Sequence, residues 1–263
     1  VLQQQYGVIA GKMTIEVGGK EYTLQQAAQF LENEDRAFRE EVYRKIQTRR
    51  LQDQEAMHDL FTSLIQKRHQ VALNAGFENY RDYAFASLGR FDYGPAECFE
   101  FHEAVAETVV PLLNEAAAKR KEEMGLDALK PFDKAVDPLG RGPLKPFETG
   151  EELLTKTIGV FDEMDPFLGN CLKEMVTLDR FDLDSRKGKN PGGYNYPLEE
   201  TGYPFIFMNA AGTVRDVVTL LHEGGHAVHS ILTKDLALNS FRNFPSEVAE
   251  LASMSMELMT MDL

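Results

Sequence analysis

Two histidines four residues apart, the first followed directly by a glutamate, are the residues of this sequence most suited to chemistry: His222-Glu223-Gly224-Gly225-His226. Residues four apart lie on the same face of a helix, so the two imidazoles can bind one metal ion. The adjacent Glu223 can act as a general base on a metal-activated water without binding the metal. The spacing therefore predicts a catalytic zinc site, with two surface histidines as the alternative.

The residues around this motif predict that its helix is buried. Apolar side chains occupy both flanks: Val217, Val218, Leu220, Leu221, Ala227, Val228, Ile231 and Leu232. Buried imidazoles need polar partners, which surface histidines do not. The flanks therefore favour the metal site.

A catalytic zinc takes three protein ligands and keeps one position open, so a third ligand is expected downstream. The candidates are His229, Asp235, Glu247, Glu250 and Glu257. His229 follows His222 by seven residues, a rise of about 10.5 Å along a helix. A zinc ion with bonds of about 2 Å cannot span that distance while also binding His226. We therefore predict that His229 supports a ligand or faces the substrate, or is simply a packed histidine.

Glu250 is the predicted third ligand. It lies in a helix expected over residues 247–261, on a face that it shares with Glu247 and Glu257. A carboxylate at the centre of such a face requires a cation if it is buried, and the alternative is an exposed acidic stripe. Glu257 is predicted to orient a ligand imidazole, while Glu247 and Asp235 remain alternative ligands.

Two segments before the motif helix are candidates for substrate binding. A glycine-rich basic loop at residues 185–194 precedes a short aromatic strand at residues 204–209. Such a strand can accept an extended peptide at a sheet edge, whereas the loop forms either a cleft wall or a charged, solvated surface. The candidate substrate-binding residues are Gly193, Tyr194, Phe207, Asn209 and Ala210.

Periodicity and turn residues predict a mainly α fold with a small β-sheet, whose edge strand near residues 204–209 lies beside the motif helix. A proline- and glycine-rich stretch suggests two domains: a helical region at 1–130 with an N-terminal β-hairpin, and a zinc-binding catalytic core at 131–263. The hairpin turns at Gly18-Gly19. Further helices are expected over residues 24–31, 34–75, 80–88, 95–124, 149–164 and 166–177.

Composition narrows the classes of partner. The 263 residues are 43% hydrophobic, which is ordinary for a globular protein, and carry a formal net charge of -14. A strongly acidic surface argues against nucleic acid or an anionic membrane as partner. Isolated Cys98 and Cys171 suit a reducing compartment, with a disulfide between them as the alternative. No stretch is long and apolar enough for a membrane span. A cytoplasmic location is therefore expected, and the oligomeric state stays open.

Taken together, several short segments resemble the oligoendopeptidase F and thimet-oligopeptidase family of zinc peptidases. They are Lys12 to Val17, Ser185 to Lys189, Gly193-Tyr194, Gly212-Thr213, Asp216-Val217, Thr219-Leu220, the motif itself, His229-Ser230 and Val248 to Ser253. The resemblance implies a helical zincin-type fold around a deep channel, one Zn²⁺ per chain and short peptides as substrates. It covers only the middle of a family member, so the chain is expected to be part of a longer protein.

The sequence departs from the family pattern in two places. Gly224 stands where the family has a bulky residue, and a second glycine should cost the helix up to about 1 kcal/mol. The downstream tyrosine and histidine groups that bind the oxyanion in the family have no counterpart after Leu263. We therefore expect a catalytic core that is incomplete at its C-terminal end.

The resulting hypothesis is a zinc-dependent oligopeptidase that hydrolyses internal peptide bonds. Zinc held by His222, His226 and Glu250 would acidify a water, and Glu223 would take its proton and pass it to the leaving amine. A carboxypeptidase-type enzyme of the same architecture is one alternative. A non-catalytic helical binding module is another, although the intact Glu223 argues against it.

Overall fold

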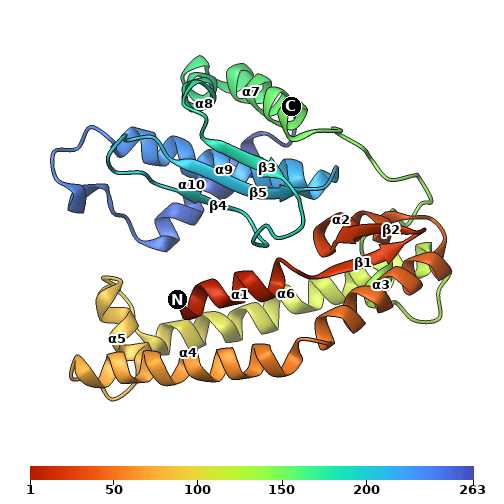
Figure 1. Ribbon diagram of the computed structural model, residues 1–263, viewed down its shortest axis with the longest axis horizontal. Helices are drawn as coiled ribbons and strands as arrows, with labels where there is room; N and C mark the ends of the chain where they lie inside the picture. The colour runs from red at the N-terminus through yellow and green to blue at the C-terminus, as the bar shows by residue number, and fades with distance from the viewer. The chain divides into compact units, whose positions relative to one another are not determined.

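The computed structural model describes residues 1–263 and divides them into two compact units (Figure 1). One unit comprises residues 1–6 and 30–143, and the other comprises residues 7–29 and 144–263. Helix α1 (Leu2–Ala10) crosses from the first unit into the second. All three ligands expected for the metal lie in the second unit. The domain limits expected from the sequence remain a prediction.

The first unit is helical throughout. It contains η1 (Gln29–Glu32, shared at its first residue with the second unit), α3 (Arg36–Leu51), α4 (Gln54–Asn74), α5 (Tyr80–Ser87), α6 (Pro95–Glu123) and η2 (Pro131–Asp133). The expectation of a single helix over residues 34–75 is wrong, because the helix is interrupted between Leu51 and Gln54. Asp53 occupies the position before α4. Aspartate is more favourable at the start of a helix than in its interior, so it suits this interruption.

The second unit begins with the expected hairpin. Strand β1 (Thr14–Val17) pairs antiparallel with β2 (Lys20–Thr23) through Gly18 and Gly19, which have φ of 59° and 77°. Two consecutive positive φ angles suit glycine and match the twist of a tight hairpin. Thr23 then caps α2 (Leu24–Ala28) through its side chain.

A three-stranded sheet carries the segment just before the motif helix. Its order is β3-β5-β4, with β3 (Phe181–Asp184) parallel and β4 (Tyr194–Tyr196) antiparallel to β5 (Phe205–Ala210). The expectation that residues 204–209 form an edge strand is therefore wrong, because β5 is central and β4 is the edge. The apolar residues of β5 favour pairing on both sides, whereas the short, more exposed β4 tolerates an open edge.

Helices cover this sheet and complete the second unit. They are α7 (Gly150–Met164), α8 (Pro166–Thr177), α9 (Val214–Thr233), η3 (Asn239–Arg242) and α10 (Ser246–Met259). Helix α9 buries Leu220 and Ala227 in a core that includes Phe161, Leu172 and Ile206. The predicted fold class, mainly α with a small sheet beside the motif helix, is confirmed.

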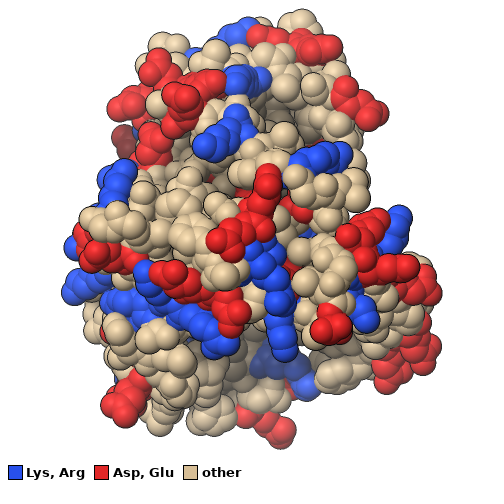
Figure 2. Space-filling model, turned by 90° about the vertical axis from the view of Figure 1, so that its right-hand side faces the viewer, with Lys and Arg blue, Asp and Glu red and all other residues tan.

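Charged side chains of both signs are interspersed on the face of the molecule drawn in Figure 2. Lys187 with Glu21 is an ion pair between two exposed side chains. Exposed pairs of this kind contribute little to stability. No helix is both long enough and apolar enough to span a membrane.

Candidate metal centre

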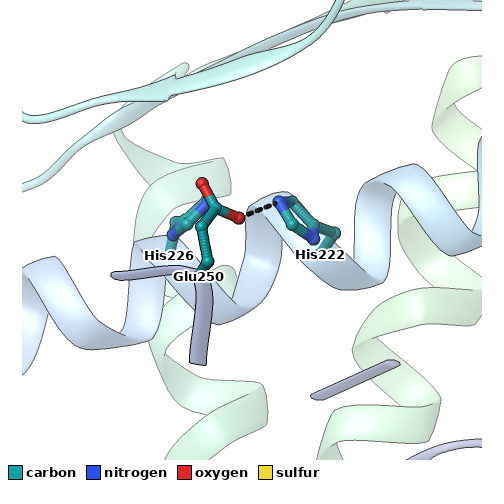
Figure 3. A group of neighbouring side chains, drawn as sticks. All are labelled: His222, His226 and Glu250. Carbon is teal, nitrogen blue, oxygen red and sulfur yellow. Dashed lines mark ion pairs between the residues drawn. The ribbon is translucent and has the colours of Figure 1, made fainter. Parts of the chain in front are cut away.

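Two imidazoles from α9 and one carboxylate from α10 converge on a common point. One ligand atom from each of His222, His226 and Glu250 lies within 4.8 Å of the other two. Glu250 Oε2 is 3.3 Å from His222 Nε2 and 3.8 Å from His226 Nε2, and Figure 3 shows this carboxylate facing both rings. A tetrahedral zinc ion with bonds of about 2.0–2.1 Å separates its ligand atoms by about 3.4 Å. The three side chains therefore fit a zinc ion.

Gly225 allows α10 to come close enough to supply Glu250. A Cβ atom at this position would lie 2.8 Å from Ser253 Cα and 3.0 Å from Met256 Cγ, both on α10. Because the nearer atom is backbone, it could move away only with the helix. The glycine is thus required by the close approach of the two helices that carry His222, His226 and Glu250.

The neighbouring Gly224 has a different environment. A Cβ atom there would lie 2.9 Å from Cζ of Phe161, whose side chain is fully buried on α7. The ring of Phe161 thus occupies the space that a larger side chain on α9 would fill. This packing compensates for the glycine expected to weaken the helix.

Glu257 lies on the same face of α10 as Glu250 and contacts the imidazole of His222. Its Oε1 lies 2.7 Å from His222 Nδ1. If the proton sits on Nδ1 and is donated to this carboxylate, the Nε2 lone pair is left facing Glu250 and the metal position. This contact is what an orienting Glu257 would make, and the role itself stays a prediction.

Glu223 lies beside the ligands and is 6% exposed. Burial raises the pKa of its carboxyl group, and Glu250 raises it further. The charge of His222 and the backbone N–H of Asn195, which donates to this carboxylate, act in the opposite direction on the pKa. A buried carboxylate with a raised pKa suits a group that must both accept and release a proton.

The remaining histidine of the segment, His229, lies outside the three-ligand group. Its ring stacks on Phe244 at a centroid distance of 3.8 Å, and its buried Nδ1 has no hydrogen-bond partner. Burial lowers the pKa of His229. Burial also lowers the pKa of His226, with the charge of His222 as a further cause. Both imidazoles are thereby favoured in the neutral form, which a metal ligand needs.

A cavity of about 480 Å³ opens next to this centre, and His222, Glu223 and Glu257 line it. Among the predicted substrate-binding residues, Gly193 and Asn209 line the cavity. The side-chain amide of Asn209 donates to the carbonyls of Asn190 and Gly192, 2.8 and 2.9 Å away, and so holds the glycine-rich loop against β5.

The other predicted substrate-binding residues do not line this cavity. The rings of Tyr194 and Phe207 stack on each other, with centroids 4.9 Å apart, and Lys189 Nζ lies 4.4 Å from the centroid of Phe207. The carbonyl of Ala210 accepts a hydrogen bond from the backbone of Ser185. Their assignment to substrate binding remains a prediction.

Several cavity residues were not identified from the sequence. They are Gln25, Gly192, Met208, Arg215, Asp216, Val218, Thr219 and Met254. Helical spacing from His222 could have indicated those on α9, such as Arg215 seven residues earlier. Gln25 lies on α2, far away in sequence, and no local pattern links it to the motif. The alternative ligands Asp235 and Glu247 are not part of the three-ligand group.

Comparisons with known proteins find similar sequences over most of the chain. Oligopeptidase PepF of Bacillus subtilis (strain 168) is 26% identical over 230 residues, which are 87% of this chain and 33% of that protein. Group B oligopeptidase PepB of Streptococcus agalactiae serotype III (strain NEM316) is 26% identical over 231 residues, 86% of this chain and 36% of that protein. This chain thus spans about a third of the length of these relatives.

A solved structure of PZ peptidase A with an inhibitor superimposes with a TM-score of 0.93 at 28% sequence identity. The superposition covers 98% of this chain and 46% of that one. The model of peptidase family M3 matches residues 29–263. The resemblance found in the sequence is confirmed over most of the chain, and the chain belongs to peptidase family M3.

Proposed function

We propose that this chain carries the catalytic centre of a zinc-dependent oligopeptidase that hydrolyses internal bonds of short peptides. The observation that supports this function is the convergence of His222, His226 and Glu250 within 4.8 Å, beside the buried carboxylate of Glu223. The relatives named as oligopeptidases support short peptides as the substrate class.

The three side chains would hold the metal, and their two nitrogens and one oxygen suit zinc. When bound, zinc would act as a Lewis acid that acidifies water and polarises the scissile carbonyl. Glu257 would keep the His222 ring oriented, because its carboxylate engages Nδ1 at 2.7 Å. Ser253 Oγ would steady Glu250, since it lies 3.3 Å from Oε2 of that residue.

Glu223 would move the proton during the reaction. Its carboxylate would accept a proton from the attacking water and deliver it to the amine that leaves. The backbone N–H of Asn195 donates to this carboxylate and would hold it in place. Burial excludes bulk water from the carboxylate, which raises its pKa and so makes it a better base.

The open edge of β4 is the proposed binding site for the peptide backbone. The N–H of Ile206, opposite Asn195 in the register, donates to Arg180 and so points away from β4. Asn195 and Ile206 therefore form a non-hydrogen-bonded pair of the antiparallel ladder. The N–H of Asn195 consequently points away from β5, toward Glu223. An extended peptide at this edge would thus lie beside the proton-transfer group.

Zinc stoichiometry and cleavage of an internally quenched peptide, each with and without chelator, test the proposal. We expect one zinc per chain, and we expect Glu223→Gln to keep the zinc while losing turnover by a factor of about 10² to 10⁴. Glu163→Gln on α7 is the matched control, because Glu163 is exposed and lines no part of the cavity. Full turnover in Glu223→Gln would refute the role of this residue.

Mass spectrometry of the products separates the alternatives. Cuts within an end-blocked peptide support an oligoendopeptidase. Release of single C-terminal residues only, from unblocked peptides, supports the carboxypeptidase alternative. Zinc binding without any cleavage by the chain would favour a binding module or a requirement for further parts of the protein.

A further inference from the structure

Arg215, in the first turn of α9, lines the cavity beside the metal centre. Apart from His222, it is the only lining residue that can carry a positive charge. Its guanidinium makes no hydrogen bond or ion pair within the chain, in contrast with Arg186, which bonds both carboxylate oxygens of Asp182. The cavity thus contains a cation that the fold itself does not use.

The three carboxylates that share the cavity are engaged elsewhere. Asp216 Oδ2 accepts the backbone N–H and the hydroxyl of Thr213, at 2.8 and 2.9 Å, and so caps the start of α9. Glu257 holds a ligand imidazole at 2.7 Å, and Glu223 is the proposed base. Arg215 is therefore left as the group in the cavity that can attract an anion.

A short extended peptide can span the distance between Arg215 and the metal centre. Arg215 precedes His222 by seven residues, which is two helical turns on the same face and about 10.5 Å along the axis. An extended peptide rises about 3.3 Å per residue. A substrate whose scissile carbonyl lies at His222 would therefore reach Arg215 within about three residues.

The direction of β4 indicates which side of the substrate reaches Arg215. A Cβ atom on Gly193, just before β4, would lie 3.3 Å from the Thr219 side chain, whereas Asn195 Nδ2 bonds Ser230 Oγ at 3.3 Å. Strand β4 thus runs in the same direction as α9. A peptide added antiparallel to β4 runs the opposite way, so its C-terminal residues approach Arg215.

We propose that Arg215 binds a carboxylate of the substrate located within three residues on the C-terminal side of the scissile bond. The carboxylate belongs either to an acidic side chain or to the C-terminus of a short peptide. This inference rests on the proposed peptidase function, and it makes Arg215 a residue that determines substrate preference.

Peptide binding to the zinc-loaded Glu223→Gln chain tests the inference without turnover. Fluorescein-labelled peptides carry Asp or Asn at each of the first three positions after the intended scissile bond, and a second set ends in a free acid or an amide. We expect at least one acidic peptide to bind about tenfold more tightly than its neutral counterpart in fluorescence anisotropy. Preference within the first set identifies a side chain, and preference within the second identifies the terminus.

Substitution of the arginine in the same background provides the decisive comparison. Adding Arg215→Gln should remove the tenfold difference, and Arg215→Lys should restore part of it, because lysine keeps the charge but not the fork of donors. Lys145→Gln, an exposed cation of the same unit that does not line the cavity, should leave the difference unchanged. Equal binding of every acidic and neutral pair, or a preference that survives Arg215→Gln, would overturn the inference.

The outcomes also separate this inference from the proposed function. Peptide binding that depends on Arg215, in a chain that takes up no zinc, would refute the proposed function and leave the anion site standing. Cleavage by the unmodified chain without any acidic preference would refute the role of Arg215 alone.

Discussion

Replacement of Glu257 tests whether the carboxylate behind His222 prepares the metal site. Its Oε1 lies 2.7 Å from His222 Nδ1, and the two side chains are 29% and 24% exposed, so water screens the contact only in part. Glu257→Gln keeps an acceptor of the same shape but removes the charge, and a neutral hydrogen bond is about half as strong as a charge-assisted one. Glu257→Ala removes the bond altogether.

Loss of such a supporting contact typically weakens metal binding by about 10- to 100-fold. We expect Glu257→Gln to fall near the lower limit and Glu257→Ala near the upper one, which correspond to about 1.4 and 2.7 kcal/mol. The cause is the freed imidazole, which can rotate or carry its proton on Nε2 in place of Nδ1. Either change removes the lone pair from the position that faces Glu250.

Competition with a chromophoric chelator at fixed pH measures the zinc affinity of each variant, and circular dichroism verifies that α9 and α10 remain folded. Glu247→Gln is the control, since it changes the same charge on the same helix outside the three-ligand group. Equal affinity of the Ala, Gln and unmodified chains would refute the reasoning. A drop in Glu247→Gln as large as that in Glu257→Gln would show that only the net charge of α10 matters.

Two further predictions concern stability. Gly225→Ala should destabilise the fold by about 1–3 kcal/mol in denaturant unfolding. The effect should exceed that of Gly224→Ala, because the new methyl group at residue 225 clashes with backbone, whereas the one at residue 224 clashes with a ring that can shift. The reverse order would contradict this packing. Hydrogen bonds from Arg186, aided by Lys189, lower the pKa of Asp182 from 3.8 to about 2, so its stabilisation is complete above pH 3.8 and is lost as the pH falls through about 2. In the unmodified chain the free energy of unfolding should therefore fall by about 2 kcal/mol on acidification, and Asp182→Asn should remove this fall. An Asp182→Asn variant with the same dependence of unfolding free energy on pH as the unmodified chain would disprove the prediction.

The sequence was most informative where one helix carries the chemistry. The spacing of His222, Glu223 and His226 follows from the helical period, and the structure places all three on α9, where His222 and Glu223 line the cavity. Glu250 is predicted as a ligand from its place on a helix face, together with the need for a third ligand, and the structure places its carboxylate near both imidazoles. It remains more than half exposed, so the burial on which that reasoning depended is not what brings it to the site.

What the sequence could not indicate depends on contacts between segments far apart in the chain. The order β3-β5-β4 is set by pairing across a long loop, which is why β5 was mistaken for the edge. Phe161 compensates for Gly224 across some sixty residues, and Gln25 reaches the cavity from the N-terminal region. Such neighbours have no periodic signature, because packing selects them only by shape.

The way in which Glu223 is tuned links the fold to the proposed chemistry. Burial alone would favour the protonated acid, which cannot accept a proton from water. The N–H of Asn195 acts against burial and stabilises the carboxylate. This contact depends on the fold, since Asn195 faces the carboxylate only because β4 is an edge strand with this register. The sheet order therefore contributes to the basicity of Glu223 as well as to the proposed placement of the peptide.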